Sequence, residues 1–286
     1  MARVVKRGRK DIYFRMDSDD EDSNEDSDDV NDDIEAQMLE GNDLLRGEQL
    51  RPIKGTHTYM NSMVALVGRQ FSGKTYTATK EIIKIVRAHP ETHLVVVINK
   101  DGESSDGTFE TLKPLILAPV VYVSHDDAVS FMKNLLDYKR VYNEVKASRL
   151  ESSMPLNYQR ELCDNLYIDD LSLPFLHTVV LMEDATKSPL IQKDGGYFND
   201  LFTQCRHIQC TFFLNIHYWK SLTTNIKSNL STAYVFGNFS RQQLQYILSQ
   251  MNLEATTKEV YEIYRRLKTY EKIIVDCNTG TFTISS

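Results

Sequence analysis

The chain has 286 residues, enough for one large α/β domain with small additions, and its 41% hydrophobic content can build the core of such a domain. No apolar run approaches the ~20 residues of a membrane span, and no apolar segment follows the basic start from Arg3 to Lys10, which argues against a transmembrane protein and a secretory signal. We therefore expect a soluble protein in a reducing compartment. Its four cysteines should stay free thiols, because their spacing fits neither a CxxC pair nor a zinc site.

The net charge of −7 is concentrated in the N-terminal part of the chain. The first 62 residues carry 9 Lys and Arg against 16 Asp and Glu, and the remainder is neutral. Between Asp17 and Asp33, 11 of 17 residues are acidic and almost none is apolar, so we predict a disordered acidic tail over residues 1–55 and a folded domain over residues 56–286. Three roles stay open for the tail: a solvating segment, a DNA mimic that occupies a basic channel, or a target for phosphorylation at its serines.

The first predicted element of the domain is a buried strand at residues 63–67, which leads into a glycine-bounded loop and a helix. The strand MVALV is followed by GRQFSGKT, and the helix is expected to run to about Ala88. This is the context of a phosphate-binding P-loop. Its glycines let successive backbone N–H groups point at one spot, where the helix dipole adds positive potential. The residues predicted to bind a triphosphate are Gly68, Arg69, Gln70, Phe71, Ser72, Gly73, Lys74 and Thr75.

Two side chains of this loop have the chemistry that a magnesium-bound triphosphate requires. Lys74 would reach the β and γ phosphates as a mobile cation, and the Thr75 hydroxyl would occupy one coordination position of Mg²⁺. The predicted cofactors are therefore ATP and Mg²⁺. The alternative is a glycine-rich turn that only joins a strand to a helix.

Two strands and a long helix are predicted before the next motif. The run Leu94–Ile98 predicts a fully buried strand and Val120–Val123 a shorter one, and a helix follows from about Asp126 to Arg149. The polar stretch that extends to Pro174 contains a possible insertion or mobile lid near residues 140–174. Elements that alternate in this way predict an α/β fold of the P-loop NTPase type, with a mostly parallel sheet and helices on both faces.

A central strand is predicted at residues 178–182, because its apolar residues are followed by two carboxylates, Glu183 and Asp184. In this Walker B arrangement one carboxylate holds Mg²⁺ and the other orients or deprotonates the water that attacks the γ-phosphate. By position Glu183 would bind the metal and Asp184 the water, and the reverse assignment by residue type stays open. The long interval after the P-loop fits ATPases with an additional strand between the P-loop and acidic strands. The simpler alternative is a strand that ends in two acids at a solvent boundary.

The strand predicted next, Thr211–Ile216, follows a short helix at Tyr197–Cys205 and ends in polar residues. In ATPases of this kind the strand after the acidic one ends in a residue that senses the γ-phosphate, and either Asn215 or His217 is positioned for this role. An ordinary core or surface histidine is the alternative for His217. Arg206 lies near the expected sheet edge, where it could act as an arginine finger on the ATP of an adjacent subunit or cap helix carbonyls.

Together, GRQFSGKT, VVLMEDA and FTQCRHIQCTFFLNIHYWKSLTTNIKSNLSTAYVFGNFS resemble the genome-packaging ATPases of large double-stranded DNA viruses, poxvirus-like in layout, within the FtsK/HerA superfamily of P-loop NTPases. The resemblance covers about residues 60–250. Family members usually have two Asp at the acidic strand and Gln at the sensor position, where this chain has Glu183 and His217.

The resemblance implies an ATP-driven motor that moves double-stranded DNA into a preformed capsid as a homo-oligomeric ring. It further implies capsid portal or vertex proteins as partners, and a location in the host-cell cytoplasm, at a viral factory, or in the virion. The residues expected to take part in catalysis are Lys74, Glu183, Asp184, Arg206 and His217, with Thr75 and Glu183 on the metal. Candidates for contacts with DNA phosphates are Lys220, Lys227, Arg241, Arg265, Arg266 and Lys268.

Other classes of P-loop protein share parts of this pattern. A nucleotide or nucleoside kinase would use lid arginines, for which Arg140, Arg149 and Arg160 are available, although the paired acids argue against it. A non-packaging DNA helicase or translocase would use the same motifs, and a non-enzymatic P-loop scaffold would not need the acids. A GTPase is rejected, because Gly102 stands where the guanine-reading motif after Asn99 requires Asp.

Overall fold

The computed structural model describes residues 51–285, except 173–175, 193–200, 252 and 254. Most of the predicted acidic tail, residues 1–50, lies outside the described residues. Residues 51–55, which the sequence assigned to the tail, belong to the folded domain, because the Ile53 side chain is only 5% exposed and packs into the core.

A single sheet organises the described residues, with eight strands in the order β3-β2-β4-β5-β1-β6-β7-β8. Strands β1 to β6 pair in parallel, and β7 and β8 are antiparallel. Strands β1, β2, β4 and β5 are buried along their whole length, as continuous apolar runs predict. The strands are β1 (Met63–Val67), β2 (Thr92–Asn99), β3 (Val120–Ser124), β4 (His177–Met182), β5 (Cys210–Ile216), β6 (Leu230–Phe236), β7 (Lys272–Asp276) and β8 (Thr281–Ser285).

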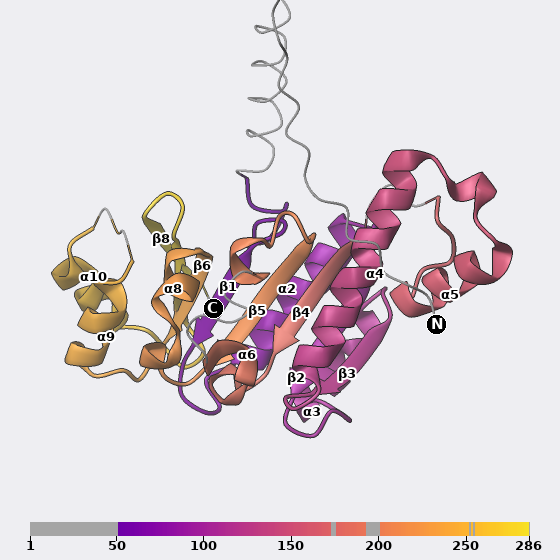
Figure 1. The fold of residues 1–286 in the computed structure, drawn as a ribbon. Helices are drawn as coiled ribbons and strands as arrows, with labels where there is room; N and C mark the ends of the chain where they lie inside the picture. Colours follow the sequence, from indigo (N-terminus) through magenta and orange to yellow (C-terminus); the bar gives the residue numbers. More distant parts are fainter. Residues whose placement is uncertain (1–50, 173–175, 193–200, 252, 254, 286) are drawn as a thin grey trace, which may run out of the picture. The chain divides into compact units, whose positions relative to one another are not determined.

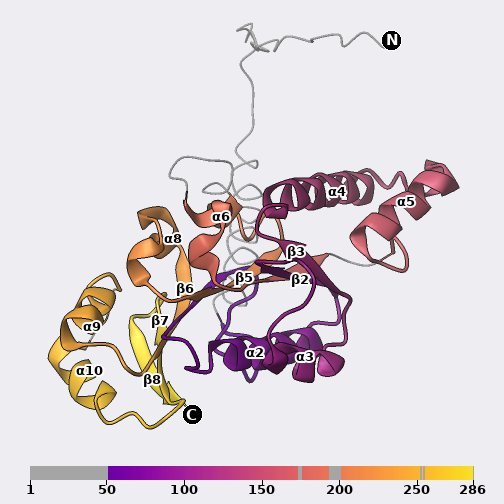
Figure 2. The same cartoon turned by 90° about the horizontal axis from the view of Figure 1, so that it is seen from below.

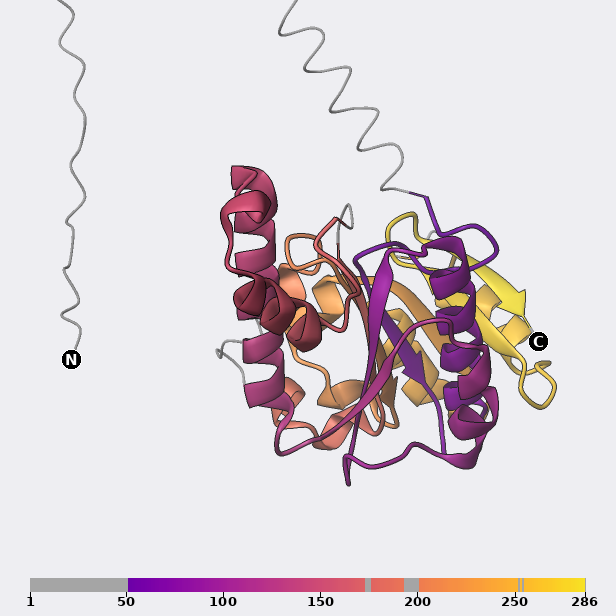
Figure 3. The same cartoon turned by 90° about the vertical axis from the view of Figure 1, so that its right-hand side faces the viewer.

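Helices cover both faces of the sheet (Figures 1 and 2). One face carries α2 (Lys74–Ala88) and α3 (Gly107–Leu112), and the other carries α4 (Ala128–Ser148), α5 (Leu156–Leu166), α6 (Pro189–Gln192) and α8 (Thr224–Ser228). The helices α9 (Arg241–Leu248) and α10 (Thr257–Tyr264) pack against this second face near β6 and β7. Figure 3 shows the sheet between α2 and α4 from the side.

The sheet has two cores because side chains of a strand alternate between its faces. In β1, Val64 and Leu66 belong to the core under α2 and α3, whereas Met63, Ala65 and Val67 belong to the core on the opposite face. All five side chains are at most 1% exposed. The P-loop strand is therefore fixed from both sides, which holds the loop after it in one position.

The predicted fold class is confirmed: the sheet is mostly parallel and helices lie on both of its faces. A strand also lies between the P-loop strand β1 and the acidic strand β4. That strand is β5, which follows the acidic motif in the sequence, while β2 and β3, the strands between the two motifs along the chain, lie beyond β4.

The predicted helix at residues 126–149 corresponds to α4, and the stretch after it contains α5. Leu162 and Leu166 of α5 are buried in the same core as Leu135 of α4. A lid function for residues 140–174 stays a prediction. No helix in the described ranges is both long and apolar enough to cross a membrane.

Candidate active site

The loop between β1 and α2 is tightly wound, and its two glycines are required for different reasons. Gly73, the N-cap of α2, has a φ of 92°, in the left-handed region that favours glycine. A Cβ on Gly68 would lie 2.5 Å from Ser72 Oγ and 2.9 Å from Phe236 Cβ, so only glycine fits there. The first N–H groups of an α-helix have no acceptor within the helix, so the start of α2 favours an anion.

Lys74 is a buried cation at the start of α2. Its side chain is held by the loop itself, because Nζ donates hydrogen bonds to the carbonyl oxygens of Gly68 and Arg69, both at 2.9 Å. Burial lowers the pKa of Lys74 to about 8, and the nearby Asp184 carboxylate acts in the opposite direction. The amine is therefore positioned beside the loop and gains from an anion that enters there.

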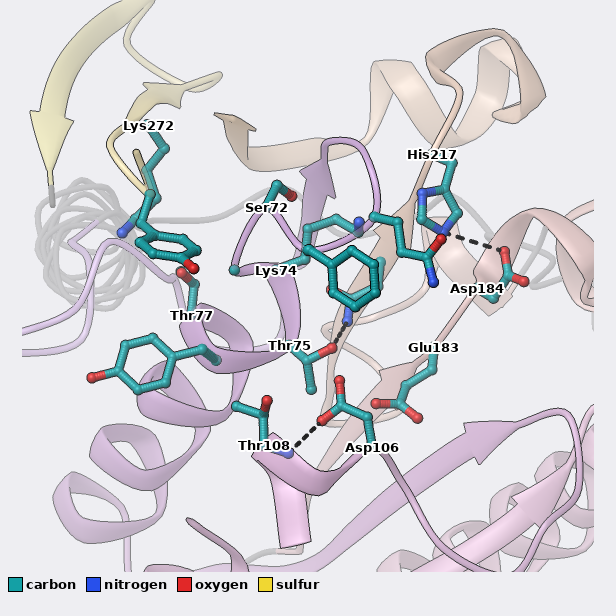
Figure 4. A pocket seen from close by; sticks show the side chains of 16 residues that line it. Ser72, Lys74, Thr75, Thr77, Asp106, Thr108, Glu183, Asp184, His217 and Lys272 are labelled. Atoms are coloured by element: carbon teal, nitrogen blue, oxygen red, sulfur yellow. Dashed lines mark hydrogen bonds and ion pairs between the residues drawn. The ribbon is translucent and has the colours of Figure 1, made fainter. Parts of the chain in front are cut away.

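A cavity of about 790 Å³ opens in front of the P-loop, at the carboxyl ends of the parallel strands (Figure 4). This edge of an open α/β sheet is where ligands usually bind. Gly68 and Arg69, whose carbonyl oxygens accept hydrogen bonds from Lys74, do not line it. The predicted site residues that line the cavity are Gln70, Phe71, Ser72, Gly73, Lys74, Thr75, Glu183, Asp184, Asn215 and His217.

Glu183 and Asp184 follow β4 directly and have different surroundings. The Glu183 carboxylate accepts a hydrogen bond from Ser105 Oγ at 2.6 Å. Burial raises the pKa of Glu183 to about 7, the Ser105 hydrogen bond lowers it, and the acids Asp106 and Glu110 raise it further. Asp184 has a φ of 47° and accepts a hydrogen bond from Thr186 Oγ1 at 3.1 Å. Glu183 is thus partly buried beside other acids, and a bound cation would stabilise its ionised carboxylate.

Of the two candidates for the sensor, Asn215 lies in β5 and His217 directly follows it, and β5 lies beside β1. Asn215 pairs with Leu66 in the sheet register, and its Nδ2 donates to Thr75 Oγ1 at 3.5 Å. His217 Nδ1 donates to the Gly68 carbonyl at 3.2 Å, so this nitrogen carries a proton, and Nε2 lies 3.9 Å from Asp184 Oδ1. His217 therefore lies between the P-loop backbone and Asp184, which follows the acidic strand, and Asn215 connects β5 to Thr75.

The donor set of the cavity fits a magnesium ion. The Thr75 hydroxyl and the carboxylates of Glu183 and Asp106 line the same cavity, and oxygen donors of this kind are what Mg²⁺ prefers. Among the described residues, Ser72 Oγ and Asn215 Oδ1 are buried without a hydrogen-bond partner, and a phosphate or a hydrated cation could satisfy them. In the part of the chain that the structure describes, no three or more His, Cys, Asp or Glu side chains form a metal-binding group, so the donor set here includes the Thr75 hydroxyl.

Arg206 is not part of this cavity. It precedes β5 and is exposed, so it lies at the amino-terminal edge of the parallel strands, whereas the P-loop follows the carboxyl end of β1. Arg206 therefore cannot act on a nucleotide held by its own chain. Its role as an arginine finger toward an adjacent subunit stays a prediction.

Sequence reasoning did not assign to the site six residues that line the cavity: Tyr76, Thr77, Asp106, Thr108, Tyr270 and Lys272. Asp106 is the N-cap of α3, where its Oδ1 accepts hydrogen bonds from the N–H groups of Thr108 and Phe109 at 2.9 Å. An Asp before a short helical pattern is a recognisable capping signal, but it does not reveal that the cap lies beside the acidic strand. Tyr270 lies in the turn before β7 and Lys272 begins β7, a strand that the sequence reasoning did not predict.

Comparison with known proteins gives similarity of fold only. No protein-family model matches the sequence, and no curated protein matches it. The fold is similar to that of the genome packaging NTPase B204 from Sulfolobus turreted icosahedral virus 2 in complex with AMPPCP, at 18% identity and a TM-score of 0.48, over 79% of this chain and 97% of that chain.

Two secretion ATPases are also similar in fold. EssC (ATPases 2 and 3) from Geobacillus thermodenitrificans is 11% identical with a TM-score of 0.47, over 76% of this chain and 38% of that one. The cytoplasmic domain of the type VII secretion ATPase EccC from Thermomonospora curvata is 12% identical with a TM-score of 0.45, over 81% of this chain and 26% of that one.

Proposed function

We propose that this chain is a magnesium-dependent ATPase that translocates double-stranded DNA and packages a viral genome into a capsid. The observation that supports hydrolysis is that Lys74 and Thr75 share one cavity with Glu183 and Asp184, although the two motifs are far apart in the sequence. Phosphate binding alone would not need two acids beside the P-loop, since their charge opposes an anion. Hydrolysis does need them, for the metal and for the attacking water.

Each group in the cavity has a defined task in this proposal. The P-loop N–H groups and Lys74 bind the β and γ phosphates, and Thr75 and Glu183 hold Mg²⁺, which neutralises phosphate charge when it is bound. Asp184 orients the attacking water and accepts its proton. His217 lies between Asp184 and the Gly68 carbonyl, and so it couples the position of Asp184 to the P-loop. Exchanging the roles of the two acids leaves the chemistry the same.

The proposal includes a homo-oligomeric ring, because an arginine finger at Arg206 could act only on the nucleotide of a neighbouring subunit: Arg206 lies at the opposite edge of the sheet from the cavity of its own chain. A neighbouring subunit could present its Arg206 to that cavity, where the charge would stabilise the transition state. A ring also provides a central channel for duplex DNA, and a capsid portal or vertex protein would receive the DNA. Exposed cations that could contact its phosphates are Lys220, Arg241, Arg265, Arg266 and Lys268, with the half-buried Lys227 beside them.

A kinase is less well supported by the site. Its lid would need arginines that converge on the phosphates, but Arg140, Arg149 and Arg160 are exposed, and none of them lines the cavity in the described part of the chain. The geometry favours transfer of the γ-phosphate to water.

The test of translocation is ATP turnover by the full chain as duplex DNA is titrated in, together with native mass measurement of the oligomer. We expect DNA to raise turnover and the mass to be that of a ring. Turnover that stays unchanged across the titration would contradict the translocase, while leaving an ATPase of another kind. The control is Lys74→Ala, which should abolish turnover with and without DNA.

A further inference from the structure

The cavity extends well beyond the space that phosphates need. Glu183 follows β4, whereas Lys272 begins β7, and β7 is the fourth strand from β4 in the order of the sheet. At roughly 4.8 Å between neighbouring strands, the end of β4 and the start of β7 are about 19 Å apart. Figure 4 shows Glu183 on one side of the P-loop residues Lys74 and Thr75, and Lys272 with Thr77 on the other. The acids and β7 therefore flank the phosphate site from opposite sides.

The end of the cavity near β7 has the chemistry of a subsite for a planar ring. Tyr270, two residues before Lys272, lines the cavity and is 63% exposed, whereas Lys272 is buried. A Cβ on Gly73 would lie 3.3 Å from Tyr270 Cδ1, so the Tyr270 ring contacts the backbone at the start of α2. Tyr270 also has a φ of 68°, a conformation that is uncommon for a bulky side chain. Strained residues of this kind concentrate at ligand sites.

We propose that Tyr270 and Lys272 form the nucleoside subsite, in which a purine base stacks on the Tyr270 ring with an acceptor edge toward Lys272. This inference rests on the proposed nucleotide binding. Because the phosphates are fixed at Lys74 with the γ-phosphate toward the acids, the nucleoside end must leave the P-loop on the β7 side. A lysine only donates hydrogen bonds, and N7 is an acceptor in both adenine and guanine, so this subsite accepts either purine. It disfavours pyrimidines, whose single ring stacks less well.

The experiment compares ATP with inorganic tripolyphosphate as ligands of the full chain in Mg²⁺, by calorimetric titration. Tripolyphosphate fills the phosphate site but has no base. The variant is Tyr270→Asn, because Asn tolerates a positive φ and removes the ring. We expect ATP binding to weaken at least about fivefold, as loss of a stacking ring does, with tripolyphosphate binding unchanged. Tyr270→Phe keeps the ring and should bind ATP as the wild type does.

The matched control is Tyr167→Asn. Tyr167 is also exposed and also has a positive φ, 55°, but it ends α5, outside the cavity. It should leave both affinities unchanged. An equal loss of ATP and tripolyphosphate binding in Tyr270→Asn would overturn the subsite, because the ring would then only support the P-loop. Unchanged ATP affinity would overturn it as well.

If the proposed nucleotide binding is wrong, the result is different: the wild type then binds neither ATP nor tripolyphosphate. If Tyr270→Asn does not fold, the wild type decides the question through its preference among nucleotides. ATP and GTP must then bind more tightly than CTP and UTP. Equal affinity for purine and pyrimidine triphosphates would contradict the proposed subsite.

Discussion

Replacing Gly68 with Ala adds a methyl group where the P-loop has no room for it. The new Cβ would lie 2.5 Å from Ser72 Oγ and 2.9 Å from Phe236 Cβ. The hydroxyl can rotate away, but Phe236 Cβ is attached to the buried backbone of β6 and cannot. We expect Gly68→Ala to lower the free energy of unfolding by about 1–3 kcal/mol, the usual cost of overpacking. ATP affinity should fall as well, because the loop must shift to relieve the contact.

Urea denaturation and ATP titration of the same variants measure both effects. Gly107→Ala is the matched control, because nothing lies within 4 Å of a Cβ at Gly107, which begins α3. It should leave ATP affinity unchanged and stability unchanged or slightly raised, since Ala favours helix over Gly by up to about 1 kcal/mol. Adding Ser72→Ala to Gly68→Ala removes the closest contact but not Phe236, so stability should recover only in part. A Gly68→Ala protein as stable as the control and with wild-type ATP affinity would refute this packing argument.

Three further predictions concern the site and its partner subunit. Because burial lowers the pKa of Lys74 to about 8 from 10.5, the folded chain loses this proton before the unfolded chain does, and wild-type stability rises between these pH values. The free energy of unfolding of Lys74→Met, measured by chemical denaturation, should therefore fall relative to that of the wild type as the pH rises over this range. A difference between the two proteins that does not change with pH would contradict the lowered pKa of a buried Lys74 amine. Thr75→Ala should lose the increase in ATP affinity that Mg²⁺ gives, whereas Thr75→Ser should keep it, as titrations with and without Mg²⁺ would measure. An equal effect of Mg²⁺ in the two variants would contradict the role of Thr75 as a metal ligand. Mixed rings of Arg206→Ala and Asp184→Asn subunits should recover ATP turnover at some interfaces, whereas mixtures as inactive as either variant alone would argue against an arginine finger from the neighbour.

The parts of the fold that the sequence predicts well are those that local pattern determines. The strand at 63–67 is observed with the same bounds, and the acidic strand begins one residue earlier than predicted, at His177. Both are buried on two faces, so their apolar runs are unbroken. Residues of the predicted P-loop, the two acids, Asn215 and His217 line one cavity, while their roles in binding and catalysis stay predictions.

The parts that the sequence did not predict depend on which distant strands become neighbours. Lys272 reaches the cavity because β7 pairs antiparallel with β6, with Lys272 opposite Phe236. Asp106 reaches it because the loop after β2 brings Ser105 into contact with Glu183. Neither pairing leaves a local signal in the residues themselves, since both depend on sheet order. The role of Arg206 depends on a second subunit, which a single chain cannot show.

The most direct measurement of the central claim is single-turnover hydrolysis of bound ATP by Glu183→Gln and Asp184→Asn in the presence of Mg²⁺. The P-loop is intact in both variants, and the cavity keeps its shape because each substitution replaces one oxygen by an amide nitrogen. We predict that both variants bind ATP but that neither hydrolyses it at an appreciable rate. Hydrolysis at the wild-type rate in both variants would show that these acids do not act on a nucleotide held by the P-loop, and would contradict the account.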